Sequence, residues 1–193
     1  MKSKVAIIGD GNVGSSLKRG IESAGYEVRA VGKDPAAVRE AAQWGDLVFL
    51  AVPFGALDEV LREAGDGIKG KVLVDVTNAL TPDYQLALGF TTSGAEELQK
   101  KARGATVVKA FNTVFAQNMA TGQVKGRKLS LFVASDDRGA KEKVLGLGRE
   151  LGFDAVDAGP LQNARGLESL GFFQIQLGYG LKMGTDIGFT LVH

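Results

Sequence analysis

Short apolar runs alternate with helical patterns along the chain, and this alternation limits the folds that the sequence can adopt. Seven runs are typical of buried strands, and they lie at 4–9, 26–31, 46–53, 71–77, 105–111, 129–135 and 153–159. Helical spacing of apolar residues falls between them, at 12–24, 34–43, 56–64, 94–103 and 137–151. Ser93 and Glu96 have capping-box spacing for the fourth helix. The alternation predicts an α/β fold with a doubly wound, mostly parallel sheet.

The length of 193 residues suits one domain with a small appendage, and 45% of the residues are hydrophobic, enough for a buried core. We expect the main domain at 1–160 and a helical segment at 161–193. That segment carries a stripe of apolar residues at helical spacing, namely Leu167, Leu170, Phe173, Leu177 and Leu181. Such a stripe covers the edge of a sheet or forms a two-fold contact, and we expect a homodimer.

Composition excludes several kinds of chemistry. The chain has no cysteine, so disulfides and thiolate metal sites are excluded, and its single histidine is His193. We therefore expect no metal site. The net charge of +1 argues against a nucleic-acid partner, and we expect the basic run "KGRK" (125–128) to be a solvated turn. No apolar run has the length of a membrane span and no signal-peptide pattern is present, so we expect a cytoplasmic protein without a membrane partner.

The first predicted strand runs directly into the glycine-rich stretch "GDGNVG" (9–14), which opens a predicted helix. In this context the pattern G-x-G-x-x-G is typical of a dinucleotide site. Gly9 permits a tight turn, Gly11 lets the backbone approach a pyrophosphate, and Gly14 lets the helix pack closely on the strand. We expect the backbone N–H groups of Asn12 and Val13 to face the phosphates.

The second strand ends in "VGKDP", where dinucleotide-binding proteins often place an acidic residue that binds a ribose. Asp34 precedes a proline, so we interpret it as the N-cap of the next helix. Gly32 then leaves room for a 2′-phosphate and Lys33 can supply a positive charge, which favours NADP(H) over NAD(H). Asp10 would repel a pyrophosphate, and we expect it to point to solvent.

Other predicted strands end at the same edge of the sheet, where ligands of doubly wound folds bind. Val52 and Pro53 end the third strand, Asn78 follows the fourth, and Asn112 and Thr113 follow the fifth. The last three offer amide and hydroxyl groups to a nicotinamide or an acceptor ring, or else serve as turn residues. We treat Asn112 and Thr113 as acceptor-site candidates.

The sequence assigns no catalytic residue. Lys109 lies inside the fifth predicted strand, where it either is a paired structural lysine or reaches the cleft from the end of the strand. A site of amides and backbone groups suits a redox acceptor that carries its own acid–base chemistry, such as a flavin or deazaflavin. The loop at 79–92 is long for a compact domain, which is typical of a functional segment.

Five segments resemble the NADP oxidoreductases that depend on the deazaflavin coenzyme F420, and are similar also to the cytosolic reductase domain of STEAP-type metalloreductases. They are "IGDGNVG" (8–14), "VGK" (31–33), "DVTN" (75–78), "VKAFNT" (108–113) and "DAGPLQNARGLESL" (157–170). The resemblance implies a Rossmann NADP-binding domain over 1–160. It implies that the residues at 9 and 11–14 contact the pyrophosphate, that Lys33 binds the 2′-phosphate, and that Val52, Pro53 and Asn78 lie near the ribose and nicotinamide.

The resemblance also implies hydride transfer between NADP(H) and a second redox partner, which is coenzyme F420 in one branch and FAD or FMN, followed by a metal ion, in the other. Gly32 and Lys33 replace a frequent serine–arginine pair, and Asn112 stands where the deazaflavin branch can have histidine. We interpret Arg165 and Glu168 as an ion pair on one helix. The alternatives are a small imine or hydroxy-acid reductase and a non-enzymatic NADPH-binding redox sensor.

Overall fold

The computed structural model describes residues 2–192, and its main sheet has five parallel strands in the order β2-β1-β3-β4-β5. The strands are β1 (Val5–Ile8), β2 (Val28–Val31), β3 (Leu47–Leu50), β4 (Val72–Asp75) and β5 (Thr106–Lys109). Every residue of β1, β3 and β4 is buried, as expected for strands that are covered on both faces. The predicted α/β fold with a doubly wound parallel sheet is confirmed.

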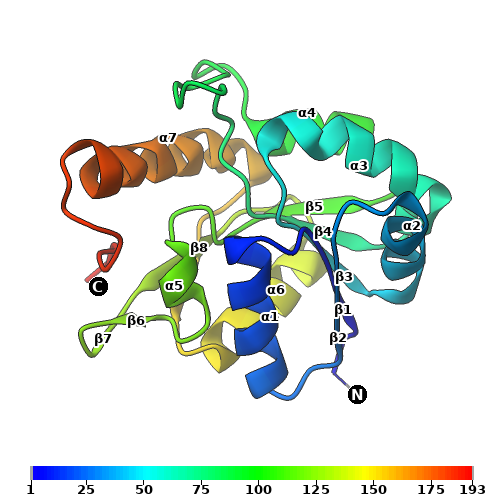
Figure 1. Cartoon of the computed structure of the whole chain (residues 1–193), viewed down its shortest axis with the longest axis horizontal. Coiled ribbons are helices and arrows are strands. Elements are labelled where there is room, and N and C mark those ends of the chain that lie inside the picture. Colours follow the sequence, from blue (N-terminus) through cyan, green and yellow to red (C-terminus); the bar gives the residue numbers. More distant parts are fainter. Residues whose placement is uncertain (1, 193) are drawn as a thin grey trace.

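Helices cover both faces of this sheet (Figure 1), and an apolar core lies between the sheet and the helices on each face. The helices of one face are α1 (Asn12–Ser23), α5 (Ala116–Met119) and α6 (Arg138–Glu150). Those of the other face are α2 (Pro35–Trp44), α3 (Leu57–Ala64) and α4 (Gly94–Lys101), with the 3-10 turns η1 (Phe54–Ala56) and η2 (Gly65–Ile68) on either side of α3. Side chains cap the N-termini of several of these helices. At the N-terminus of α4, Ser93 accepts a hydrogen bond from the Glu96 N–H at 3.1 Å, as predicted.

All seven predicted strands are present, but the last two form a separate parallel pair. β8 (Ser130–Val133) pairs with β9 (Asp154–Asp157), and this pair meets β5 through an antiparallel bridge between Lys109 and Ala134. The sequence patterns missed a short hairpin of β6 (Gln123–Val124) and β7 (Arg127–Lys128). The basic run predicted to be a solvated turn forms the tip and second strand of this hairpin, and its residues are exposed.

The C-terminal segment begins with the 3-10 turn η3 (Leu161–Asn163) and continues as α7 (Ala164–Ile175), whose first turns contact α4 (Figure 1). The α-helix ends earlier than the apolar stripe predicted, because Gln176–Gly180 form a π-helical turn (η4). Along that stripe Leu167 is buried, whereas Phe173 and Leu181 are exposed. The stripe therefore packs on the rest of the chain mainly at its start. A domain boundary after residue 160 stays a prediction.

In the glycine-rich turn after β1, two of the three glycines have no room for a side chain. A Cβ atom on Gly14 would lie 1.8 Å from the carbonyl oxygen of Gly9, and a Cβ atom on Gly9 would lie 2.1 Å from that of Ala51. Gly9 also has a φ of +111°, which residues with side chains rarely adopt. Gly11, in contrast, has no atom within 4 Å of its missing Cβ. The turn thus packs tightly at two glycines and stays open at the third.

Substituting Gly14 by alanine is expected to lower the free energy of unfolding by about 3 kcal/mol, because the added methyl group forces the backbone of α1 away from β1. Gly11→Ala is the matched control in the same turn and should cost less than about 1 kcal/mol. Urea denaturation followed by circular dichroism measures both losses. Equal losses for the two variants would contradict this account of the turn.

Candidate functional site

A cavity of about 660 Å³ opens at the carboxyl ends of β1, β3 and β4. It lies where the strand order reverses between β1 and β3, which is the usual ligand position in such sheets. Its volume is in the range of small-molecule sites, roughly 300 to 1,000 Å³. Six of the predicted site residues line it, namely Gly11, Asn12, Val13, Val52, Pro53 and Asn78.

The N-terminus of α1 faces this cavity through its backbone. Gly11 is the N-cap, and no side chain of residues 2–192 caps the helix. The first N–H groups of an α-helix have no partner within the helix, and the helix dipole makes this end positive. Asn12 and Val13 both line the cavity at this end of the helix, and the binding of a phosphate by their N–H groups stays a prediction.

At the end of β2 the structure confirms the capping role of Asp34, whose carboxylate accepts a hydrogen bond from the Ala37 N–H at 2.7 Å. Lys33 is exposed beside it. Asp10 is exposed as well, but its carboxylate lies against Gly32: a Cβ atom on Gly32 would be 2.8 Å from the Asp10 Oδ2 atom. The exposure of Asp10 confirms the expectation that it points to solvent, and the carboxylate lies beside Gly32 within that exposed region.

Asn78 lies in the wall of the cavity and is held by Asn112 behind it. The Asn78 side-chain amide donates to the Asn112 carbonyl at 3.0 Å, and the Asn112 amide donates to Asn78 Oδ1 at 2.9 Å and to the Leu167 carbonyl of α7 at 2.8 Å. Asn112 and Thr113 are buried and do not line the cavity. Their predicted placement against an acceptor is therefore not met: Asn112 orients Asn78, and Thr113 packs in the interior.

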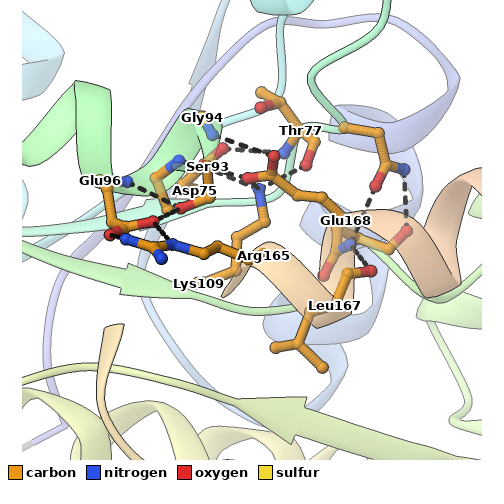
Figure 2. Close-up of polar contacts among 12 residues, drawn as sticks. Asp75, Thr77, Ser93, Gly94, Glu96, Lys109, Arg165, Leu167 and Glu168 are labelled. Atoms are coloured by element: carbon orange, nitrogen blue, oxygen red, sulfur yellow. Dashed lines mark hydrogen bonds and ion pairs between the residues drawn. The ribbon is translucent and has the colours of Figure 1, made fainter. Parts of the chain in front are cut away.

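Lys109 is fully buried, and three oxygen atoms surround its ammonium group (Figure 2). Nζ lies 2.9 Å from Asp75 Oδ2, 2.9 Å from Glu168 Oε1 and 2.6 Å from the Thr77 carbonyl oxygen. Burial alone would lower the pKa of Lys109, but the two carboxylates outweigh it and raise this pKa above its ordinary value. Of the two alternatives, the structure selects the paired structural lysine.

Glu168 and Arg165 both connect α7 to α4, and they do not pair with each other. The Glu168 carboxylate accepts hydrogen bonds from the N–H groups of Gly94 at 2.9 Å and Ala95 at 3.2 Å. The Arg165 guanidinium binds both carboxylate oxygens of Glu96, at 2.9 and 2.7 Å, and this contact lowers the pKa of Glu96 (Figure 2). The predicted Arg165–Glu168 pair was therefore wrong, because each side chain reaches a partner on the neighbouring helix.

The loop at 79–92 forms an outer wall of the cavity, to which Leu80, Thr81, Pro82 and Tyr84 contribute. An antiparallel bridge between Leu80 and Leu86 and a hydrogen bond from the Gln85 N–H to Thr81 Oγ1 at 3.0 Å hold the first half of the loop together. The length of the loop predicted a functional role, but no spacing pattern singled out Tyr84. Thr77 was also missed, although it directly precedes Asn78 and lines the cavity.

Two features are absent from residues 2–192. No group of three or more histidine, cysteine, aspartate or glutamate side chains in this range is arranged to hold a metal ion. None of the helices in the same range combines the length and the apolar character needed to cross a bilayer.

At Gly171, α7 packs closely against Asn78 and Asn112. A Cβ atom there would lie 2.3 Å from Asn78 Oδ1 and 2.9 Å from Asn112 Nδ2. Gly171→Ala is therefore expected to displace α7, to lower the free energy of unfolding by about 2 kcal/mol, and to weaken NADPH binding about fivefold, because Asn78, which the sequence predicts to lie near the nicotinamide, would move. Urea denaturation and NADPH fluorescence titration measure the two effects.

Gly166 is the matched control for this substitution, since it lies in the same helix and has no atom within 4 Å of its missing Cβ. Gly166→Ala should leave NADPH binding unchanged and raise the free energy of unfolding by up to about 1 kcal/mol, because alanine is the better helix former. If Gly171→Ala bound NADPH as tightly as Gly166→Ala does, α7 would not support the cavity in the way described.

The chain is similar to several known proteins. Residues 4–79 match the model of the family described as NADP oxidoreductase, coenzyme F420-dependent. The F420-dependent NADP reductase of Methanothermobacter marburgensis is 31% identical over 145 residues, which cover 68% of this chain and 62% of that protein. Metalloreductase STEAP3 of Rattus norvegicus is 31% identical over 180 residues, which cover 86% of this chain and 36% of that protein.

The similarity extends to the whole chain in a solved structure. A proposed F420-dependent NADP reductase from Arthrobacter sp. FB24 has a TM-score of 0.91 and 29% identity, and the match covers 99% of this chain and 100% of that one. The chain spans about a third of the length of the metalloreductase relatives. The resemblance seen in the five sequence segments is confirmed, and residues 4–79 match the family model of coenzyme F420-dependent NADP oxidoreductases.

Proposed function

We propose that the chain transfers a hydride between NADP(H) and a flavin or deazaflavin, with coenzyme F420 as the first candidate. The observation that supports this most directly is one cavity that reaches from the N-terminus of α1 to Asn78 and the loop at 79–92. Relatives named F420-dependent NADP reductase add weight to this choice of acceptor.

The dinucleotide fits the residues at the start of this cavity. The N–H groups of Asn12 and Val13 bind the pyrophosphate, and Gly11 leaves open space for its approach. Lys33 lies exposed at the end of β2, where a 2′-phosphate would be. Val52 and Pro53 form the wall along the nicotinamide ribose.

The end of β4 supplies the polar groups for the nicotinamide. The hydroxyl oxygen of Thr77 is buried and has no hydrogen-bond partner among residues 2–192, although Thr77 lines the cavity. Buried polar atoms are normally paired, so this hydroxyl is suited to a ligand. We assign Thr77 and Asn78 to the nicotinamide carboxamide, whose amide and carbonyl groups match their donors and acceptors.

The acceptor side of the cavity is apolar. Phe54, Leu80, Pro82 and Ile175 come from three separate segments, namely η1, the loop at 79–92 and α7, and give a surface against which a flat ring can stack and from which water is excluded. When both ligands are bound, the nicotinamide supplies the hydride and the flavin or deazaflavin ring accepts it. The protein's task is to hold the two rings together, which accounts for the amides, hydroxyls and apolar groups in the wall.

A small imine or hydroxy-acid reductase is the second candidate, and the position of Tyr84 is the observation that favours it. The tyrosine lines the cavity, and reduction of an imine or carbonyl needs a proton donor at such a place. A flavin or deazaflavin does not need this donor. The effect of substituting Tyr84 therefore distinguishes the two candidate reactions.

Loss of NADPH absorbance, followed with F420, FMN, FAD, ferric chelates, imines and carbonyls, tests the proposal. We expect oxidation with F420 or a flavin, and a rate that stays within about twofold in Tyr84→Phe because no side-chain acid is used. Turnover confined to imines or carbonyls, with a loss of about 100-fold or more in Tyr84→Phe, would establish the reductase instead. Tight NADPH binding without turnover of any acceptor would indicate the redox sensor.

We also propose that two copies of the chain associate through the C-terminal segment. Phe173, Tyr179, Leu181 and Met183 are between 53% and 68% exposed, which is unusual for neighbouring large apolar side chains. A two-fold contact would bury them. Sedimentation at micromolar concentration should show a dimer, and Leu181→Asp should shift it toward monomer. A monomeric wild-type chain would contradict this assembly.

A further inference from the structure

We infer that Asp10 is a specificity-determining residue that opposes Lys33 at the ribose 2′ position, so that the chain discriminates weakly between NADPH and NADH. This inference rests on the proposed dinucleotide site. It concerns the balance between two nicotinamide cofactors, which the glycine-rich motif and Lys33 alone do not determine.

The position of the Asp10 carboxylate is unusual for its place in the sequence. Asp10 directly precedes Gly11, the N-cap of α1, where a carboxylate can interact with the positive end of the helix. No side chain of the described residues caps α1. The Asp10 carboxylate lies instead over Gly32, at the end of the neighbouring strand β2.

Gly32 occupies the place from which NAD-binding proteins of this fold extend an acidic side chain to the ribose 2′-hydroxyl. The Asp10 oxygen lies 2.8 Å from where a Cβ atom of residue 32 would be. The carboxylate that the end of β2 lacks is therefore supplied from the turn after β1. Gly32 is needed for this arrangement, because any side chain there would meet the Asp10 carboxylate first.

The two charges beside Gly32 favour different ligands. The ammonium of Lys33 attracts a 2′-phosphate, whereas the carboxylate of Asp10 repels it and can accept a hydrogen bond from a 2′-hydroxyl. In the part of the chain that the structure describes, neither side chain is in an ion pair. At a solvent-exposed site a repulsion of this kind changes affinity by about fivefold.

The test is the ratio of the dissociation constants of NADH and NADPH, measured by fluorescence titration at low ionic strength on the full chain. Asp10→Asn keeps the shape of the side chain and should raise the preference for NADPH about fivefold, whereas Lys33→Ala should lower it about fivefold. Gly32→Ala should act in the same direction as Asp10→Asn, because its methyl group displaces the flexible carboxylate. The shifts should shrink in high salt.

Asp34→Asn is the control of equal charge, since Asp34 is next to Lys33 but its carboxylate is turned to the Ala37 N–H. It should change the ratio less than twofold, and asparagine keeps the cap. An unchanged ratio in Asp10→Asn, or an equal shift in Asp34→Asn, would overturn the inference while the dinucleotide site stands. If the wild-type chain bound neither NADPH nor NADH, the proposed function would fail and this inference with it.

Discussion

The arrangement of the site depends on the buried ammonium group of Lys109. A charge without access to water needs oxygen partners, and removing one of them typically costs about 3 to 5 kcal/mol because the others are left unpaired. The partners of Lys109 come from different segments: Asp75 from β4, the Thr77 carbonyl just beyond it, and Glu168 from α7. The charge is satisfied only when α7 lies across the ends of β4 and β5. The C-terminal segment is thus tied to the sheet by electrostatics as well as by apolar packing.

The ion pairs of Lys109 are connected to the cavity through neighbouring contacts of α7. The Glu168 carboxylate also accepts hydrogen bonds from the N–H groups of Gly94 and Ala95. The carboxylate that binds Lys109 therefore also joins α7 to α4. One turn further along α7, the missing side chain of Gly171 lets the helix lie directly on Asn78. Ile175, another turn on, reaches the cavity itself. The last part of the chain therefore completes a cavity whose glycine-rich turn is at the other end of the sequence.

The order of strands and helices could be predicted from the sequence because it follows from local patterns: apolar periodicity, glycine turns, and caps such as Asp34. The contacts that assemble the site are not local. Arg165 and Glu168 have the spacing of a helical ion pair, yet their partners Glu96 and Gly94 lie 69 and 74 residues away. Asn112 follows its strand just as Asn78 does, but residues 111–115 are all buried, so the two asparagines have different roles.

A crystal structure of the complex with NADP⁺ would show whether NADP(H) lies along the carboxyl ends of β1, β3 and β4, as we propose. We expect the pyrophosphate within hydrogen-bonding distance of the Asn12 and Val13 N–H groups, the 2′-phosphate beside Lys33, and the nicotinamide against Thr77 and Asn78. A dinucleotide bound in the reverse direction, with its adenine in the cavity, or bound elsewhere on the chain would contradict this proposal.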